Sequence, residues 1–135
     1  MSTLDNPKAL FQTTCSTNSE PYALQNIGDM MSPEFSENCI IIVDPGMPIH
    51  NQAFVIIDFK DELYFRQYII ENNNQLMRCL NSSYDDIKLN NDFKVRGCII
   101  QQKQRKQKSL HYYLLDKESG KMTFNCKGKE KEINT

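Results

Sequence analysis

The chain has 135 residues, the usual size of a single domain that buries a core without metal ions or disulfides. Hydrophobic residues make up 39% and charged residues 24%, a composition that excludes a disordered chain. No apolar run reaches the roughly 18 residues of a membrane helix. The first ten residues lack the apolar stretch of a secretion signal, so we expect a cytoplasmic protein.

Charge is unevenly distributed along the chain. Residues 1–100 carry 7 basic and 13 acidic side chains, a net charge of −6. Residues 101–135 carry 9 basic and 4 acidic side chains, a net charge of +5. A basic carboxyl-terminal segment therefore follows an acidic body.

The cysteines predict free thiols. Their number is odd, none are spaced as C-x-x-C, and none cluster with either histidine. We therefore expect reduced cysteines, no metal site and no cofactor. The cysteines are Cys15, Cys39, Cys79, Cys98 and Cys126.

The first predicted elements are an arm and two strands. Residues 1–20 are rich in Ser, Thr, Asn and Gln without an apolar period, which predicts a flexible amino-terminal arm. A short strand is predicted at Tyr22–Ile27. The β-branched run Cys39–Val43 is typical of a strand that is buried on both faces.

The middle of the chain predicts consecutive antiparallel strands. Ala53–Phe59 and Glu62–Glu71 flank Lys60-Asp61, which suits a tight hairpin turn. Alternation along the second of these strands puts even-numbered side chains on one face and odd-numbered ones on the other. Three more strands are expected at Gln75–Asn81, Asp86–Leu89 and Phe93–Gln102.

The carboxyl-terminal part predicts a last hairpin. Leu110–Leu115 and Lys121–Cys126 flank the turn residues Asp116–Gly120. The fold class is therefore mainly β. No helix-turn-helix pattern precedes the strands, so we expect no DNA-reading domain in this chain.

Two segments resemble a known family. The run YALQNIGDMMSPEFSENCIIIVDP resembles the nucleophile segment of LexA-like, UmuD-like and related phage repressor proteins, where G-D-S-M-x-P precedes an apolar strand ending in V-D. The run FVIIDFKDELYFRQYIIENNNQLMRCLNSSYDDI resembles the block that carries the catalytic lysine and then L-x-x-x-N-x-x-Y. The likeness covers roughly residues 22–102. It implies a LexA/signal-peptidase-like domain over 21–108, with 109–135 as a carboxyl-terminal β-hairpin and basic tail.

The resemblance implies that the catalytic dyad of these self-cleaving peptidases is lost. Met30 occupies the place of the nucleophilic serine, and Arg66 occupies the place of the general-base lysine. A thioether has no proton to lose, and a guanidinium keeps its proton in proteins. Because the family's chemistry needs an activated hydroxyl beside a neutral amine, we interpret the chain as a pseudopeptidase.

Two further departures from the family concern glycine. Relatives cut themselves at an Ala-Gly or Cys-Gly bond upstream of the serine, whereas residues 1–27 here contain no glycine. Two turns of the family contain a glycine, and Asn38 and Gln52 occupy these positions in this chain. Glutamine adopts the left-handed conformation poorly, so we expect the turn at residues 50–53 to be rebuilt.

The former active-site cleft is the predicted binding site. Arg66 is either an arginine stacked on neighbouring tyrosines or the anchor for a docked strand or acidic group. Ser32, just before Pro33, is the alternative nucleophile if the dyad has moved. The predicted cleft residues are Met30, Met31, Ser32, Tyr64, Arg66 and Tyr68.

Three functions remain open from the sequence. The first is an inactive regulatory module that forms a homodimer, as the resemblance implies, and engages a LexA-like or phage-type repressor of the SOS response or a translesion polymerase. The second is an active peptidase with relocated residues. The third is nucleic-acid binding through the basic residues Lys103, Arg105, Lys106 and Lys108.

Overall fold

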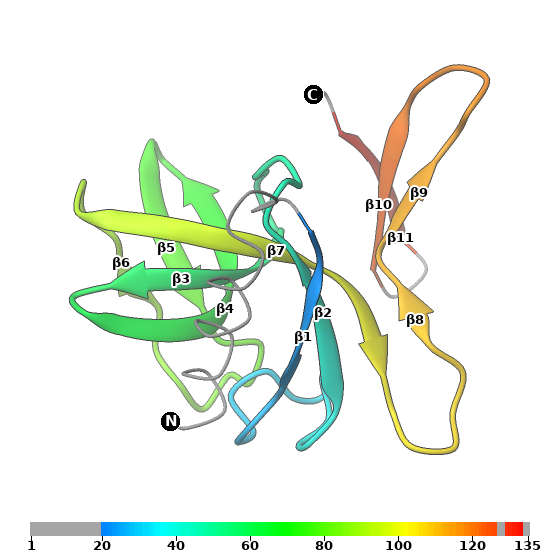
Figure 1. The fold of residues 1–135 in the computed structure, drawn as a ribbon. Coiled ribbons are helices and arrows are strands. Elements are labelled where there is room, and N and C mark those ends of the chain that lie inside the picture. Colours follow the sequence, from blue (N-terminus) through cyan, green and yellow to red (C-terminus); the bar gives the residue numbers. More distant parts are fainter. Residues whose placement is uncertain (1–19, 127–128, 134–135) are drawn as a thin grey trace.

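The computed structural model describes residues 20–126 and 129–133, and the predicted amino-terminal arm lies outside them. These residues form antiparallel strands and no helix (Figure 1). The predicted mainly β fold class is therefore confirmed. This part of the chain also holds no helix long and apolar enough to cross a membrane.

The strands form two sheets. The larger sheet has the order β1-β2-β7-β3-β4-β5-β6, with β8 also paired to β7. The smaller sheet has the order β11-β10-β9. The strands are β1 (Tyr22–Gln25), β2 (Ile40–Asp44), β3 (Phe54–Phe59), β4 (Glu62–Glu71), β5 (Asn74–Arg78), β6 (Ile87–Lys88), β7 (Phe93–Lys103), β8 (Leu110–His111), β9 (Tyr113–Leu115), β10 (Met122–Cys126) and β11 (Lys129–Ile133).

Two tight turns set the register of the central hairpins. Lys60 and Asp61 have φ angles of 50° and 66°, and Asn72 and Asn73 have φ angles of 51° and 64°. Positive φ at both central residues is the signature of a type I′ turn, whose twist matches that of paired strands. The hairpin predicted around Lys60-Asp61 is confirmed, and β4 has the predicted bounds.

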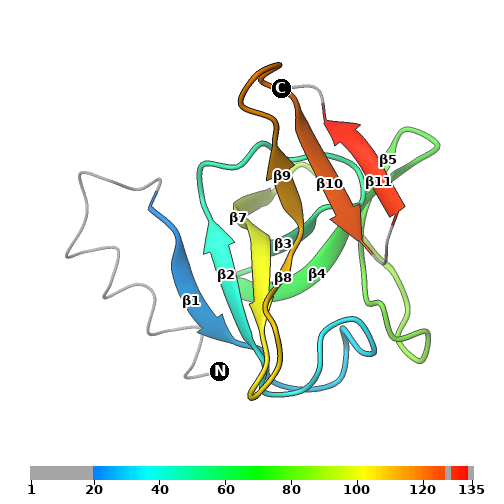
Figure 2. The ribbon, with the colours of Figure 1, turned by 90° about the vertical axis from the view of Figure 1, so that its right-hand side faces the viewer.

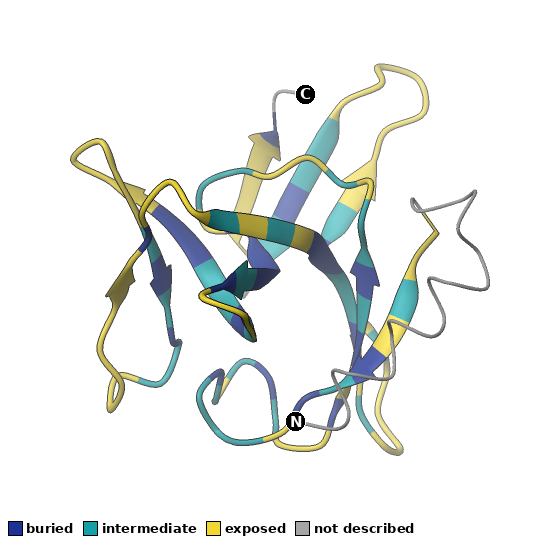
Figure 3. Cartoon of the chain, turned by 60° about the vertical axis from the view of Figure 1, so that its left-hand side comes forward, coloured by how far each residue is buried: buried dark blue, intermediate teal, exposed yellow. Residues whose placement is uncertain are grey.

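The burial predicted for the isoleucine run is wrong. In β2 only alternate residues are buried: Ile41 and Val43 face the core, whereas Ile40 is exposed. The strand buried on both faces is β3, in which every residue except Asp58 is buried. A β-branched run reports strand propensity, but the burial of each face depends on what the fold packs against it (Figure 3).

Strand β7 joins the two halves of the larger sheet. Its first half pairs with β3 and its second half pairs with β2 (Figure 1). Gly97 lies between these halves, where an added Cβ would stand 2.6 Å from Cγ1 of Val43 and 3.1 Å from the carbonyl oxygen of Asp44. Glycine is therefore required here because β2 approaches the β7 backbone so closely.

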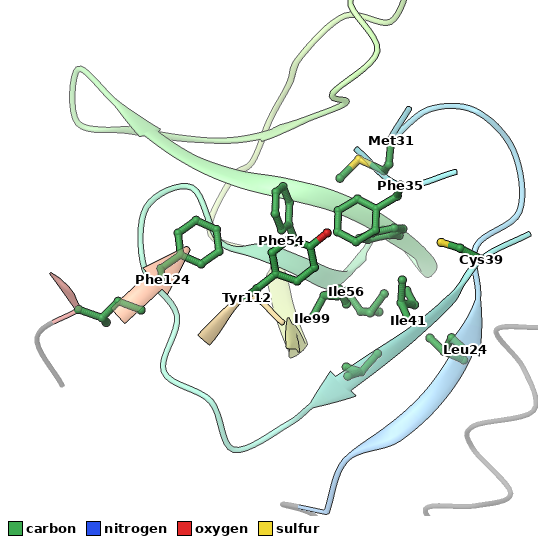
Figure 4. Close-up of a cluster of buried hydrophobic side chains, with 13 residues drawn as sticks. Leu24, Met31, Phe35, Cys39, Ile41, Phe54, Ile56, Ile99, Tyr112 and Phe124 are labelled. Atoms are coloured by element: carbon green, nitrogen blue, oxygen red, sulfur yellow. The ribbon is translucent and has the colours of Figure 1, made fainter. Parts of the chain in front are cut away.

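The sheet separates two apolar cores. Phe54 and Ile56 of β3 point into the first core, and Val55 and Ile57 point into the second. Phe35 lies at the centre of the first core, among aromatic rings from distant parts of the chain (Figure 4). Its ring centroid is 4.9 Å from those of Phe54 and Phe65 and 5.4 Å from that of Tyr112. The edge-on packing with the two phenylalanines is favourable for aromatic pairs.

The turn before β3 keeps the left-handed conformation. Gln52 has a φ of 77°, and Asn38, before β2, has a φ of 69°. The N–H of Gln52 donates to the carbonyl of Tyr68 at 2.7 Å, and the side chain of Gln67 donates to the carbonyl of Gln52 at 2.9 Å. The expectation of a rebuilt turn is therefore wrong, because β4 holds Gln52 in a conformation that glutamine alone disfavours.

The smaller sheet completes the first core. Tyr112, Phe124 and Ile133 are buried in the same cluster as Phe35. β8 leads directly into β9, so one segment contributes to both sheets (Figure 2). The predicted hairpin corresponds to β9 and β10, and β11 is a third strand that was not predicted. Its sequence KEKEI carries charge at four successive positions and gives almost no apolar alternation.

His50 connects the body to the smaller sheet. Its Nε2 lies 2.6 Å from the hydroxyl of Tyr113, and its Nδ1 lies 2.9 Å from the carbonyl oxygen of Asn51. A carbonyl only accepts, so Nδ1 carries the hydrogen and the neutral ring accepts from Tyr113 at Nε2. Lys131 of β11 also donates to the carbonyl of Asn51 at 3.0 Å. The ring of Phe124 packs 4.9 Å from that of His50.

Burial makes this contact sensitive to pH. Burial, aided by the charge of Lys131, lowers the pKa of His50 below its usual 6.5, although the hydrogen bond to Asn51 acts in the opposite direction. The unfolded chain therefore binds more protons between the folded pKa and 6.5. We predict that the melting temperature falls as pH decreases from 7.5 to 5.5. His50→Gln should remove part of this fall, whereas the exposed control His111→Gln should keep it.

Candidate functional site

The loop between β1 and β2 carries Met30. Gly28 opens it with a φ of 94°, and a Cβ on Gly28 would come within 3.0 Å of the Met30 side chain. Two backbone hydrogen bonds fold the loop back. The N–H of Ser32 donates to the carbonyl of Asp29 at 3.1 Å, and the N–H of Phe35 donates to the carbonyl of Met31 at 2.9 Å. The positive φ of this turn therefore favours glycine, and an added Cβ would displace the end of the Met30 side chain.

The segment that follows β5 holds this loop from one side. The backbone N–H of Asn81 donates to the carbonyl of Met30 at 3.0 Å, and its side chain donates to the carbonyl of Asp29 at 3.2 Å. The hydroxyl of Tyr84 donates to a carboxylate oxygen of Asp29 at 2.8 Å, which raises the pKa of Tyr84. The two segments that carry the family resemblance are thus joined through Asn81 and Tyr84.

A polar network holds the same loop from the other side. The hydroxyl of Tyr112 donates to the carboxylate of Glu34 at 2.6 Å. The side-chain amide of Gln102 lies 2.9 Å from both the Tyr112 hydroxyl and the carbonyl oxygen of Glu34. Burial, followed by the bond to Glu34, raises the pKa of Tyr112. Since Gln102 and Tyr112 are almost fully buried, breaking this network would leave polar groups unpaired.

Met30 and Arg66 line the same pocket. Its volume is about 80 Å³, and its wall combines the end of β1, the loop that follows it, β2 and β4. The lining residues are Gln25, Asn26, Ile27, Met30, Met31, Ile41, Leu63, Tyr64, Phe65 and Arg66. The structure thus brings the two residues predicted at the dyad positions to one pocket, although 35 residues separate them in the sequence.

Two contacts hold the guanidinium of Arg66 in place, but no described carboxylate neutralises its charge. One terminal nitrogen donates to the carbonyl of Phe65 at 2.8 Å, and the guanidinium lies over the Tyr64 ring, 5.2 Å from its centroid. No carboxylate of the described residues forms an ion pair with it. The nearby carboxylate of Glu62 accepts a hydrogen bond from Tyr64 at 2.7 Å. The pocket therefore contains a fixed positive charge with donors to spare.

The other predicted cleft residues divide between pocket and core. Met31 lines the pocket but is only 1% exposed and belongs to the first core. Tyr68 lies in the second core, where its ring packs 6.4 Å from that of Phe93, and it is not on the pocket wall. Ser32 is also outside the wall, with its hydroxyl 3.4 Å from the carbonyl of Phe35.

The predicted basic residues lie outside the pocket wall. Lys103 ends β7, and the remaining three occupy the exposed turn that leads to β8. None of them forms an ion pair with a described residue. Among residues 20–126 and 129–133, no three His, Cys, Asp or Glu side chains gather into a possible metal site. The four cysteines in these ranges are free thiols.

Sequence reasoning missed the network around Glu34 and the role of His50. Both are contacts between segments that are far apart in the chain, 78 residues for Glu34 with Tyr112 and 63 residues for His50 with Tyr113. No spacing or periodicity signals such contacts. The polar residues of β7 gave a hint, since Gln101 and Gln102 follow the apolar run Cys98-Ile99-Ile100 in the same strand.

Comparison with known proteins identifies one family. The family model described as Peptidase S24-like matches residues 2–100, which is most of the chain. The match includes the pocket residues and the clamp formed by Asn81 and Tyr84. No curated protein matches the chain.

Proposed function

The chain belongs to the peptidase S24-like family, and we propose that it is a regulatory interaction module of this family without peptidase activity. It acts by binding other proteins, through dimerisation and through the pocket that contains Met30 and Arg66. Its partner is a transcriptional repressor or another protein of the DNA-damage response.

The observation that carries this proposal is the meeting of Met30 and Arg66 in one pocket. The Met30 thioether has no proton to lose and cannot act as the nucleophile. The Arg66 guanidinium stays protonated in proteins and cannot act as the base. A relocated dyad would need a serine hydroxyl beside a lysine amine. No such hydrogen bond joins serine and lysine side chains in the described residues, and Ser32 bonds to the Phe35 carbonyl instead. The chemistry of these groups therefore supports binding rather than cleavage.

The pocket lies beside an edge of the larger sheet, which supports binding of an extended segment. β1 forms one edge of the described sheet, and Gln25, at its end, is part of the pocket wall. An extended peptide that adds to a sheet edge gains affinity from backbone hydrogen bonds and specificity from pockets for alternate side chains. Such binding needs neither a nucleophile nor a base.

Exposed leucines support dimerisation through the carboxyl-terminal part. Leu114 and Leu115 of β9 are 51% and 55% exposed, and Leu110 of β8 is 45% exposed. β9 is an edge strand of the smaller sheet, and it carries no charged side chain. The opposite edge strand, β11, is exposed and charged, which disfavours pairing with another sheet. A second copy of the chain would cover the β9 edge.

Restoring the dyad tests the proposed loss of activity. Met30→Ser combined with Arg66→Lys supplies a hydroxyl and an amine whose pKa partial burial lowers. We predict that this double variant cleaves, in trans and best at alkaline pH, a supplied peptide with a family-like Ala-Gly bond. Its own chain should stay intact because residues 1–27 lack glycine. Mass spectrometry of the peptide and protein measures both outcomes.

The two single variants are the controls and should release no product. Rapid cleavage of its own amino-terminal segment by the double variant would contradict the absence of a cleavable bond. Cleavage of the peptide by the native protein would contradict the proposal itself.

A charge on β9 tests the dimer. Leu114→Lys introduces a charge at the proposed interface, where burial of an unpaired ammonium is unfavourable. We predict that it raises the dimer dissociation constant at least tenfold without changing the melting temperature of the monomer. Sedimentation velocity over a concentration series measures this. Ile70→Lys, at an isoleucine that is 44% exposed on β4, is the control and should leave the dimer intact. An unchanged dissociation constant for Leu114→Lys would place the interface elsewhere.

A further inference from the structure

We propose that the pocket beside β1 receives one acidic side chain, preferably glutamate, carried by an extended segment of another protein and bound by Arg66. This inference rests on the proposed function, and it adds the chemical class of the ligand. The residues that carry it are Arg66 and the apolar wall around it.

The size of the pocket limits what it can hold. A volume of about 80 Å³ is several times smaller than the roughly 300–1,000 Å³ of sites for cofactors and drug-sized molecules. A single side chain fits this space, so the rest of any ligand must lie outside, along the sheet edge at Gln25.

The charge of the pocket selects an acid. Arg66 is the cation of the wall, and it lacks an ion pair among the described residues. Two carboxylates that are next to pocket residues in the chain accept hydrogen bonds from tyrosines, Glu62 from Tyr64 and Asp29 from Tyr84. A carboxylate of another protein would therefore form charge-assisted hydrogen bonds with Arg66 that the described residues do not supply.

The geometry favours glutamate over aspartate. The guanidinium is already oriented by the Phe65 carbonyl and the Tyr64 ring, so little side-chain entropy is lost when a ligand binds. The apolar part of the pocket wall includes Ile27, Met30 and Leu63. The second methylene of glutamate would lie along this apolar surface while its carboxylate reaches Arg66.

The acid comes from another protein rather than from the described residues next to β1. Glu20 precedes β1, whereas the pocket lies at the end of the same strand, so about 16 Å of extended chain separates Glu20 from Gln25. Upstream of Glu20, Asp5 is the only acidic residue. Occupation of the pocket by Asp5 is a distinct outcome, which the variant Asp5→Asn resolves.

Selection from a library of displayed peptides tests the inference. This selection does not require the sequence that flanks the acidic residue to be known. Random twelve-residue peptides are selected against the native protein, Arg66→Gln, Arg66→Glu and the control Lys60→Gln. Lys60 lies at the exposed turn of the same hairpin and is absent from the pocket wall. Like Arg66→Gln, Lys60→Gln therefore removes one positive charge, but at a position outside the pocket. Circular dichroism melts confirm that all four proteins are folded.

The native protein and Lys60→Gln should both enrich peptides with an acidic residue at one fixed position, glutamate more often than aspartate. Arg66→Gln should lose this preference, and Arg66→Glu should replace it with lysine or arginine. A selected peptide should bind Arg66→Gln at least tenfold more weakly than the native protein, as expected for a lost hydrogen bond to a charged group.

Other outcomes separate the inference from the function on which it rests. Peptides enriched with no acidic preference would overturn the role of Arg66 and leave a segment-binding module standing. No enrichment above a surface without protein would overturn both. If Asp5→Asn alone raises the affinity for the selected peptide tenfold, Asp5 occupies the pocket and the assignment to another protein is wrong.

Discussion

The clamp between the loop at Asp29–Met30 and the segment Asn81–Tyr84 is the constraint on which the site depends. Three hydrogen bonds, from the backbone and side chain of Asn81 and from the hydroxyl of Tyr84, fix the loop beside β4. Without them, the loop would rest on its own turns, on the burial of Phe35 and on the hydrogen bonds of Glu34 to Gln102 and Tyr112. Since β4 carries Arg66, this clamp determines that Met30 and Arg66 line one pocket.

On the proposal that the chemistry is lost, the same arrangement explains how a binding surface persists. The clamp uses backbone groups, an amide and a phenol, and none of its bonds involves the side chains of Met30 or Arg66. Substitutions at the dyad positions therefore leave the frame of the site unchanged. On the opposite side, the network of Glu34, Gln102 and Tyr112 ties the loop to β7 and to the residue that joins β8 to β9. The proposed dimer edge and the proposed pocket are thus supported by one continuous set of buried contacts.

Local patterns predicted most of the larger sheet. The tight turn at Lys60-Asp61, although not its type, and the alternation in β4 follow from short-range sequence, and the family resemblance alone paired Met30 with Arg66. Three features required the fold. The one-sided burial of β2 depends on what packs against it, the left-handed Gln52 depends on hydrogen bonds from β4, and β11 has no apolar pattern. The position of Tyr68 in the second core, away from the pocket, depends on how the sheet divides the two cores.

The most direct test of the account is the intact mass of the native protein during prolonged incubation at alkaline pH, with and without activated recombinase filament, the conditions that trigger self-cleavage in active relatives. The account predicts one species of unchanged mass throughout, because neither Met30 nor Arg66 can take part in the reaction. A specific internal cut that persists in the presence of inhibitors of contaminating proteases and after repeated purification would contradict it. That result would mean that the chain forms a working catalytic pair from other residues.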